Sequence, residues 1–248
     1  MNRIAQGLTL VLLGAAALSS TLFSDLYLNW VKPAFGPFLI AAGAVMAILG
    51  VLVIAAELRG GGSAEPDCAP DHGHDHERAP RVAWLLLAPV VAVFVVAPPA
   101  LGSYTVERDD APAAPPEAPL RGSSFDDGLD EAAPGEAVDM DIRQFVMRAW
   151  VDEERAMAGR EIELTGFAVP AEDGQGWYLA RLQMACCAAD AIVNKVLITN
   201  TTAPDKDSWW TVRGTWVEPE GDLADVAQHE FHALDQEAVQ NPPDPYEG

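Results

Sequence analysis

Two adjacent cysteines, Cys186 and Cys187, followed closely by Asp190, have the residue types and spacing to do chemistry. Thiolates and carboxylates together bind soft divalent metal ions. Two thiols can instead form a disulfide, which between adjacent residues closes a strained ring and is easily reduced. A structural role is the third interpretation, because a small cysteine side chain also fills a tight corner of a core. We favour metal binding, with Cys186, Cys187 and Asp190 as ligands.

A second group of ligating side chains lies in the segment GGGSAEPDCAPDHGHDHERAP, residues 60–80. It holds Cys68, His72, His74 and His76, and imidazole and thiolate are ligands that zinc accepts. Gly and Pro around the His-x-His-x-His pattern let these side chains converge without fixing a geometry. The pattern therefore predicts an exchangeable site for zinc or another soft divalent metal. A solvated polar loop is the alternative, because His-rich tracts are identified by composition alone.

Three apolar stretches come before the cysteine pair, at Ile4–Phe23, Pro37–Ala56 and Val82–Gly102. Each has about the 20 residues that a helix needs to cross a bilayer. The first also fits a cleaved signal peptide, but the two further stretches close behind it favour a retained helix. We expect a transmembrane domain over residues 1–102, with the His-bearing segment as a loop at 57–81.

The orientation of these spans follows from their short connecting loops, where Lys and Arg counts decide the side. Arg3 and the loop with Arg59, Arg78 and Arg81 are expected in the cytoplasm, whereas the first loop carries Lys32 alone. Three crossings then place the rest of the chain outside. We expect a multi-pass protein of the cell membrane with an extracytoplasmic C-terminal domain.

The remainder of the chain is acidic, and the 248 residues carry a formal net charge of −22. Without a basic stripe the chain is a poor nucleic-acid binder. Residues 103–138 are rich in Pro, Ala and acids, which predicts a disordered or extended linker. The sequence contains no phosphate-binding loop, no dinucleotide-binding glycine pattern and no nucleophile elbow, so we do not expect an enzyme.

Residues 139–248 have the pattern of a small soluble domain. Asp141 can cap a helix that Gly159 closes, and Gly166 and Gly214 lie inside later strands, where an interior glycine marks a bulge or bend. A helix followed by about five short strands predicts an OB-like barrel. The fold class is therefore an α+β membrane protein, with three transmembrane helices, a linker and a C-terminal OB-like β-barrel domain with a leading helix. The predicted strands are Gly159–Val169, Trp177–Cys187, Ala191–Asn200, Ser208–Glu218 and one within His229–Val239.

Two further histidines, His229 and His232, are spaced His-x-x-His. Either could join the thiols in holding a soft ion. This spacing places them on opposite faces of a strand or on roughly one face of a helix. We interpret them as surface histidines.

The segments GREIELTGF, RLQMACCAADA and SWWTVRGTW, together with the closing PPDPYE, resemble the YcgQ-like family of two-component membrane permease subunits. The motif CCAADA at 186–191 is the most specific element of this resemblance. The family implies a small membrane subunit paired with a larger polytopic permease similar to organoarsenical effluxers. We therefore expect a non-enzymatic, membrane-anchored accessory subunit in contact with the lipid bilayer. A membrane-anchored thiol oxidoreductase and a stand-alone metal sensor or chaperone are the alternatives.

Overall fold

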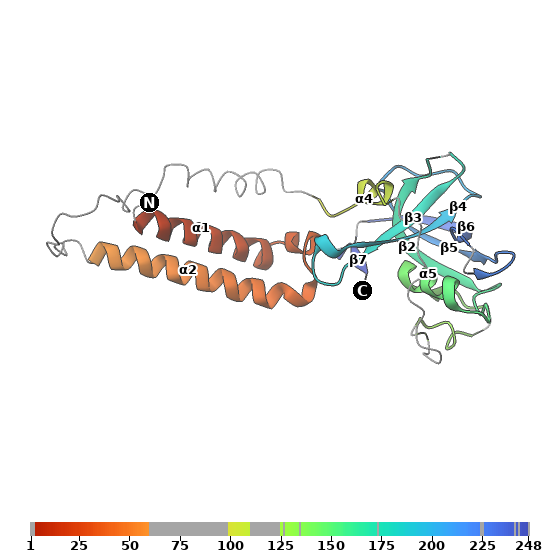
Figure 1. The fold of residues 1–248 in the computed structure, drawn as a ribbon, viewed down its shortest axis with the longest axis horizontal. Coiled ribbons are helices and arrows are strands. Elements are labelled where there is room, and N and C mark those ends of the chain that lie inside the picture. Colours follow the sequence, from red (N-terminus) through yellow and green to blue (C-terminus); the bar gives the residue numbers. More distant parts are fainter. Residues whose placement is uncertain are drawn as a thin grey trace, which may run out of the picture. The chain divides into compact units, whose positions relative to one another are not determined.

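The structure is a computed structural model of the chain and divides into two compact units, Met1–Pro99 and Ala100–Gly248 (Figure 1). Most of the predicted third span, 82–102, and of the predicted metal-binding loop, 57–81, lies outside the described residues. The structure describes residues 3–59, 99–109, 125, 127–133, 135–172, 174–223, 226–240, 242 and 244–247.

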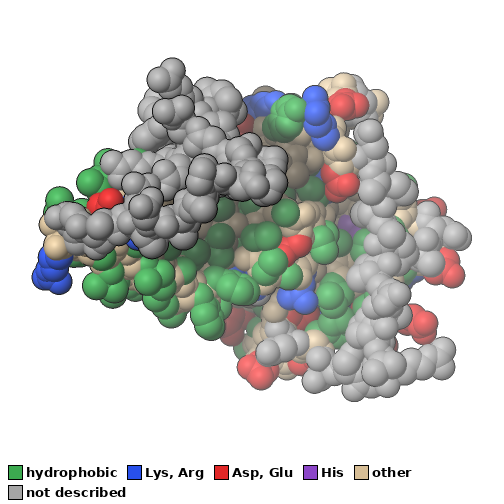
Figure 2. All heavy atoms as spheres, turned by 60° about the vertical axis from the view of Figure 1, so that its left-hand side comes forward, with side chains coloured by type: hydrophobic (Ala, Val, Ile, Leu, Met, Phe, Trp, Pro, Cys, Tyr) green, Lys and Arg blue, Asp and Glu red, His purple; other side chains and the backbone are tan. Residues whose placement is uncertain are grey.

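The first unit contains two long helices, α1 (Arg3–Leu22) and α2 (Gly36–Arg59). Two short 3-10 helices, η1 (Leu26–Asn29) and η2 (Pro33–Phe35), connect them. Both long helices are apolar enough to cross a membrane by length and composition, a test that a signal sequence near the N-terminus also passes. Hydrophobic side chains are frequent on the part of these helices that is visible in Figure 2. The helices predicted from the first two apolar stretches are confirmed, whereas three spans remain a prediction.

Glycines allow α1 and α2 to pack with their backbones in close approach. Gly7 and Gly14 on α1, and Gly43 and Gly50 on α2, are buried and lie seven residues apart on each helix. A Cβ atom at Gly14 would lie 2.6 Å from the carbonyl oxygen of Gly43, and one at Gly50 would lie 2.6 Å from that of Gly7. A seven-residue repeat stays on one helix face, and small residues on such a face let apolar helices approach closely.

The described strands of the second unit form one mixed seven-stranded sheet. Their order is β1-β2-β5-β6-β4-β3-β7, and β2 also pairs with β3, so β2, β5, β6, β4 and β3 form a closed cycle. Pairing is antiparallel except for β1–β2, β4–β6 and β3–β7. The strands are β1 (Val138–Asp139), β2 (Glu161–Pro170), β3 (Trp177–Gln183), β4 (Ile192–Ile198), β5 (Trp209–Val217), β6 (Glu230–Val239) and β7 (Tyr246–Glu247).

The two interior glycines fall where the sheet is irregular, as predicted. The register of β5 against β6 shifts between Arg213 and Gly214. A Cβ atom at Gly214 would overlap the carbonyl oxygen of His232, and one at Gly166 would lie 2.6 Å from the carbonyl oxygen of Ala180. Near Gly166, β2 changes its pairing partner from β5 to β3. Only glycine accommodates these approaches, so both positions shape the closed cycle.

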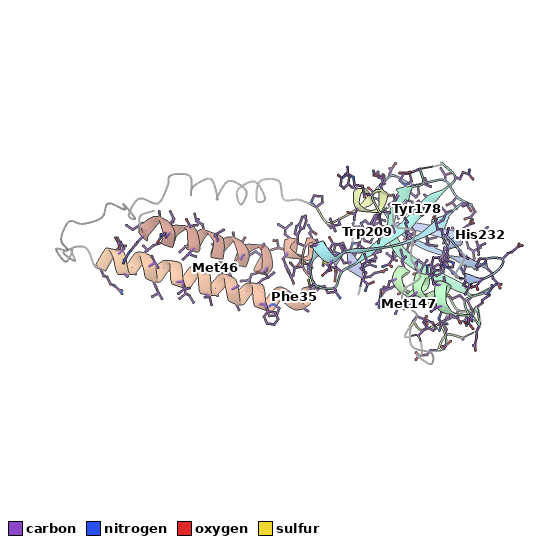
Figure 3. The ribbon with its side chains drawn as sticks, viewed as in Figure 1. Phe35, Met46, Met147, Tyr178, Trp209 and His232 are labelled. Carbon is purple, nitrogen blue, oxygen red and sulfur yellow. The ribbon has the colours of Figure 1, made fainter. Side chains whose placement is uncertain are left out.

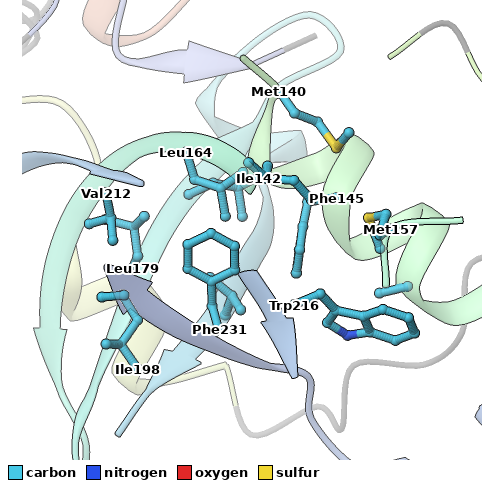
Figure 4. Close-up of a cluster of buried hydrophobic side chains, with 14 of the residues drawn as sticks. Met140, Ile142, Phe145, Met157, Leu164, Leu179, Ile198, Val212, Trp216 and Phe231 are labelled. Carbon is cyan, nitrogen blue, oxygen red and sulfur yellow. The ribbon is translucent and has the colours of Figure 1, made fainter. Parts of the chain in front are cut away.

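The main core packs helix α5 (Ile142–Val151) against the sheet. Phe145 of α5 meets Phe231 of β6 edge to face, with ring centroids 5.5 Å apart (Figure 4). A second, smaller cluster includes Phe167, Leu182, Met184 and Tyr246, with Tyr178 and Trp209 partly buried against it (Figure 3). A modest core of this kind is enough for a domain of this length.

Helix α5 is shorter than predicted. It ends at Val151, not near Gly159, because the side chain of Asp152 offers the backbone an alternative to the helix. Its carboxylate accepts hydrogen bonds from the N–H groups of Glu154 and Ala156, and such local side-chain bonds compete with helix continuation.

The extended linker predicted over 103–138 is wrong for the parts that the structure describes. Residues Ser103–Glu107 form a short helix, α4, and Val106 is 3% exposed within the second cluster. Asp127 forms a buried ion pair with Arg148 of α5, at 2.8 Å between Oδ2 and Nε. Val106 and Asp127 therefore have partners in the folded unit, which composition alone does not indicate. Residues 110–124 lie outside the described chain.

Candidate metal site

The adjacent cysteines lie in the connection between β3 and β4, which we call the hairpin tip (Ala185–Ile192). The strand predicted to continue through Cys187 ends at Gln183, because the N–H groups that follow Met184 do not join the ladder. Those of Ala185, Cys186 and Cys187 all donate to the side chain of Asp190. A 3-10 turn, η4 (Ala188–Asp190), then leads into β4.

Asp190 holds the hairpin tip in shape. Its Oδ1 accepts a hydrogen bond from Ala185 at 2.8 Å, and its Oδ2 accepts bonds from Cys186 at 2.8 Å and Cys187 at 3.2 Å. The side-chain hydrogen bond from Cys186 and these backbone donors lower the pKa of Asp190 to about 2. The carboxylate is therefore ionised at neutral pH, and both of its oxygens are engaged.

The two thiols face the same side of the tip, although neighbours on a regular strand would point to opposite faces. Their Sγ atoms lie 3.5 Å apart, and neither cysteine is in a disulfide. With metal–sulfur bonds of about 2.3 Å, this separation gives an angle of roughly 100° at the metal, which suits tetrahedral coordination and not a linear one. One ligand atom from each of Cys186, Cys187 and Asp190 lies within 4.8 Å of the others.

The tip presents one thiol fully to solvent. Cys186 is exposed and Cys187 is half-buried. The hydrogen bond to Asp190, followed by the one to Cys187, raises the pKa of the Cys186 thiol to about 12. The thiol is therefore protonated at neutral pH, and a bound metal must displace its proton. Any metal ion held by this thiol would bind more tightly as the pH rises.

The structure does not bring the predicted histidines to the thiols. The carbonyl oxygen of His229 accepts a hydrogen bond from Leu197, which lies five residues, or about 16 Å of strand, from Ile192 at the tip. His229 is 3% exposed and packs on Trp150, with ring centroids 4.7 Å apart. This burial lowers its pKa to about 4. The interpretation as a surface histidine is wrong for His229 and confirmed for His232, which is exposed on β6.

The other predicted ligands, Cys68, His72, His74 and His76, lie outside the described residues. Their zinc site remains a prediction from composition and spacing.

Tyr246 and Glu247 are not identified from the sequence as residues that pair with the end of β3, next to the tip. Tyr246 pairs with Leu182 and Glu247 with Gln183, next to the end of β3. The backbone N–H of Met184 donates to the carbonyl oxygen of Glu247 at 3.3 Å. The segment PPDPYE is visible in the sequence as a motif, but pairing between such distant segments leaves no local pattern.

No curated protein and no solved structure matches the chain. Residues 137–247 match the family model described as the DUF1980 C-terminal domain, a range that includes Cys186, Cys187 and Asp190. The match fits the resemblance to the YcgQ-like family at a coarse level. The second folded unit of this chain therefore carries a DUF1980 C-terminal domain.

Proposed function

We propose that the chain is a membrane-anchored accessory subunit of a two-component permease, whose C-terminal domain binds a soft metal ion through Cys186 and Cys187. The observation that carries this proposal is the accessible thiol pair, with 3.5 Å between the sulfur atoms and a loop held by Asp190. Two thiolates are soft donors that suit zinc or a similar ion, and Asp190 fixes the backbone that carries them.

The strand pairings support an OB-like barrel as the scaffold of the site. The closed cycle of β2, β5, β6, β4 and β3 is the connectivity that a small five-stranded barrel requires, and the bends at Gly166 and Gly214 are features of such closure. The helix α5 packs over one part of its core.

The composition of the membrane helices supports a partner protein. Within α1 and α2 the ionisable residues are confined to Arg3, Glu57 and Arg59, close to the helix ends. Buried ionisable residues mark the ion and proton paths of transporters. A polytopic permease is therefore proposed to supply the transport path, with this chain beside it in the bilayer. The Arg distribution supports an extracytoplasmic C-terminal domain.

The environment of Cys186 favours metal binding over the oxidoreductase alternative. Thiols that exchange disulfides have lowered pKa values, whereas the hydrogen bond to Asp190 raises the pKa of Cys186 to about 12. A metal ion can displace this proton, but a thiol of raised pKa is a slow nucleophile at neutral pH.

Two measurements test the proposal. The full chain in detergent, with Cys68, His72, His74 and His76 replaced by Ser, is titrated with zinc under reducing conditions. We expect one ion per chain, which a Cys186→Ala, Cys187→Ala double variant does not bind. Equal binding by both proteins refutes the site.

Affinity purification from the native membrane tests the subunit assignment. We expect a polytopic membrane protein to co-purify in a stable, stoichiometric complex. Recovery of the chain alone in mild detergent argues against the subunit assignment and leaves the metal-binding result unaffected.

A further inference from the structure

The place where the chain enters the second unit lies beside the hairpin tip. Ala100 and Leu101 pack against the second cluster, which includes Leu182, Met184 and Tyr246. The backbone N–H of Leu101 donates to the hydroxyl oxygen of Tyr246 at 3.0 Å. Leu182, which pairs with Tyr246, is only four residues before Cys186.

The residues of the tip belong to the same cluster. Ala188 and Ala191 pack against it from the hairpin tip, as Ala100 and Leu101 do from the entering segment. Figure 1 shows the entering segment and the connection after β3 at the same end of the sheet. The entry point and the two thiols therefore share one end of the domain.

The entering segment, residues 100–107, is bound to the domain by several polar contacts. The backbone N–H and the hydroxyl of Ser103 donate to the two carboxylate oxygens of Asp207, each at 2.8 Å. Lys206 and Glu107 form an ion pair at 2.7 Å. The chain is thus held to the domain at Leu101, near the end of the apolar stretch Val82–Gly102, and at Ser103 and Glu107 just after it.

The surface of the tip is apolar and uncharged, in contrast to the rest of an acidic chain. Ala185, Cys186, Ala189 and Ile192 are exposed, and the side chain of Ile192 is 59% exposed. Asp190 is the one charged residue of the tip, and three backbone donors occupy its carboxylate. The headgroup region of a bilayer accommodates such a surface, because the tip presents no free carboxylate to anionic lipid.

We propose that the hairpin tip is the membrane-facing end of the C-terminal domain and lies on the lipid headgroup region, with Cys186 at the bilayer surface. The inference rests on the proposed membrane anchoring and is independent of metal binding. The predicted span Val82–Gly102 leads directly into the segment that is bound at Leu101 and Ser103, beside the tip. No linker therefore separates the predicted span from this end of the domain, so this end should lie close to the bilayer surface.

Lipid quenching of a fluorescent label tests this arrangement. Ile192→Cys is made in a full-length chain that lacks the three native cysteines, labelled with a small fluorophore and reconstituted into phosphatidylcholine vesicles with nitroxide-bearing headgroups. Val217→Cys is the matched control, because Val217 is 41% exposed. Val217 pairs with Glu230, the partner of Leu197 at the far end of β4.

We expect the label at 192 to be quenched at least threefold more strongly by the lipid nitroxide than the label at 217. Ala189→Cys provides a second position in the tip, with the same result expected. Equal quenching at both ends, or stronger quenching at 217, overturns the proposal. Vesicle flotation is measured on the same samples. A chain that does not float with lipid overturns the anchoring and this inference together, whereas a floating chain with an unquenched tip overturns this inference alone.

Discussion

Glu247 accepts a hydrogen bond at 2.7 Å from the backbone N–H of Ile142, which opens helix α5. Its second carboxylate oxygen accepts a bond at 2.9 Å from Arg143. These N–H groups have no partner within the helix, and a carboxylate at a helix N-terminus also interacts favourably with the helix dipole. Since Glu247 also pairs with Gln183, one residue joins the start of α5 to the end of β3, the strand that leads into the hairpin tip.

The first prediction is a pH dependence of stability that originates at Glu247. Burial raises its pKa from 4.5 to about 7, although the two backbone donors oppose this effect. The folded state therefore binds more protons than the unfolded state between pH 4.5 and 7. The free energy of unfolding should fall as the pH rises through this window, by up to roughly 3 kcal/mol.

Chemical unfolding of the full chain, followed by tryptophan fluorescence at several pH values, measures this dependence. Glu247→Gln should be less stable than the wild type and should flatten the slope between pH 4.5 and 7. An identical slope in the two proteins would show that another group is responsible.

The second prediction concerns the support that Asp190 gives to the thiols. Asp190→Asn keeps the size of the side chain but places an amide group where three N–H donors converge. We expect zinc affinity at the tip to fall about 10- to 100-fold, the usual effect of removing a group that orients ligands. Competition with a chromophoric chelator measures the zinc affinity. Glu237→Gln on β6 is the control, because it removes one negative charge away from the tip. Unchanged affinity in Asp190→Asn would count against Asp190 as the organiser of the tip.

The sequence predicts the elements of the second unit better than its long-range contacts. Alternating or β-branched residues and turn signals predict four of the five long strands. The fifth is placed within His229–Val239 because a small barrel requires a further strand. The end of α5 depends on how Asp152 uses its carboxylate, and the order of the linker depends on the Asp127–Arg148 pair. The vicinal thiols are visible as a motif. The hydrogen bonds from the backbone N–H groups of the two cysteines to Asp190 require a turn geometry that residue types alone do not specify.

The third prediction tests the glycine contact between α1 and α2. In Gly14→Leu the new side chain meets the backbone of Gly43, where even a Cβ atom would lie at 2.6 Å. Backbone atoms cannot move aside as a flexible side chain does. We therefore expect the packing of α1 on α2 to lose about 1–3 kcal/mol of free energy. Thermal unfolding of the full chain in detergent detects it. Ala15→Leu, at an exposed position of the same helix, should have little effect, and equal effects of the two changes would contradict the packing.

The fourth prediction addresses the segment with Cys68, His72, His74 and His76. A peptide of residues 60–80 should bind zinc at pH 7 and lose it near pH 5, because imidazoles must be neutral to ligate a metal. Calorimetry at the two pH values measures the binding. A peptide with the three histidines changed to Asn is the control. Absence of binding heat at pH 7 would leave the solvated-loop interpretation.

The last prediction separates the structural and ligand roles of Cys187. Its side chain accepts a hydrogen bond from the backbone N–H of Asp190 and so caps the turn η4, whereas Cys186 is exposed. Replacing Cys186 by Ala should therefore change the free energy of unfolding by less than about 0.5 kcal/mol, the usual scale for a surface position. Replacing Cys187 by Ala should cost about 1 kcal/mol, as the loss of a cap does.

Cys187→Ser distinguishes the two roles, because a hydroxyl oxygen retains the cap but is a hard and weak ligand for a soft ion. We expect Cys187→Ser to unfold like the wild type and to bind zinc as poorly as Cys187→Ala. If Cys187 only fills a corner of the fold, Ser and Ala should differ from the wild type in stability alone, with zinc binding intact in both. Paired unfolding and zinc titrations of the three proteins therefore decide between a ligand and a packing residue at this position.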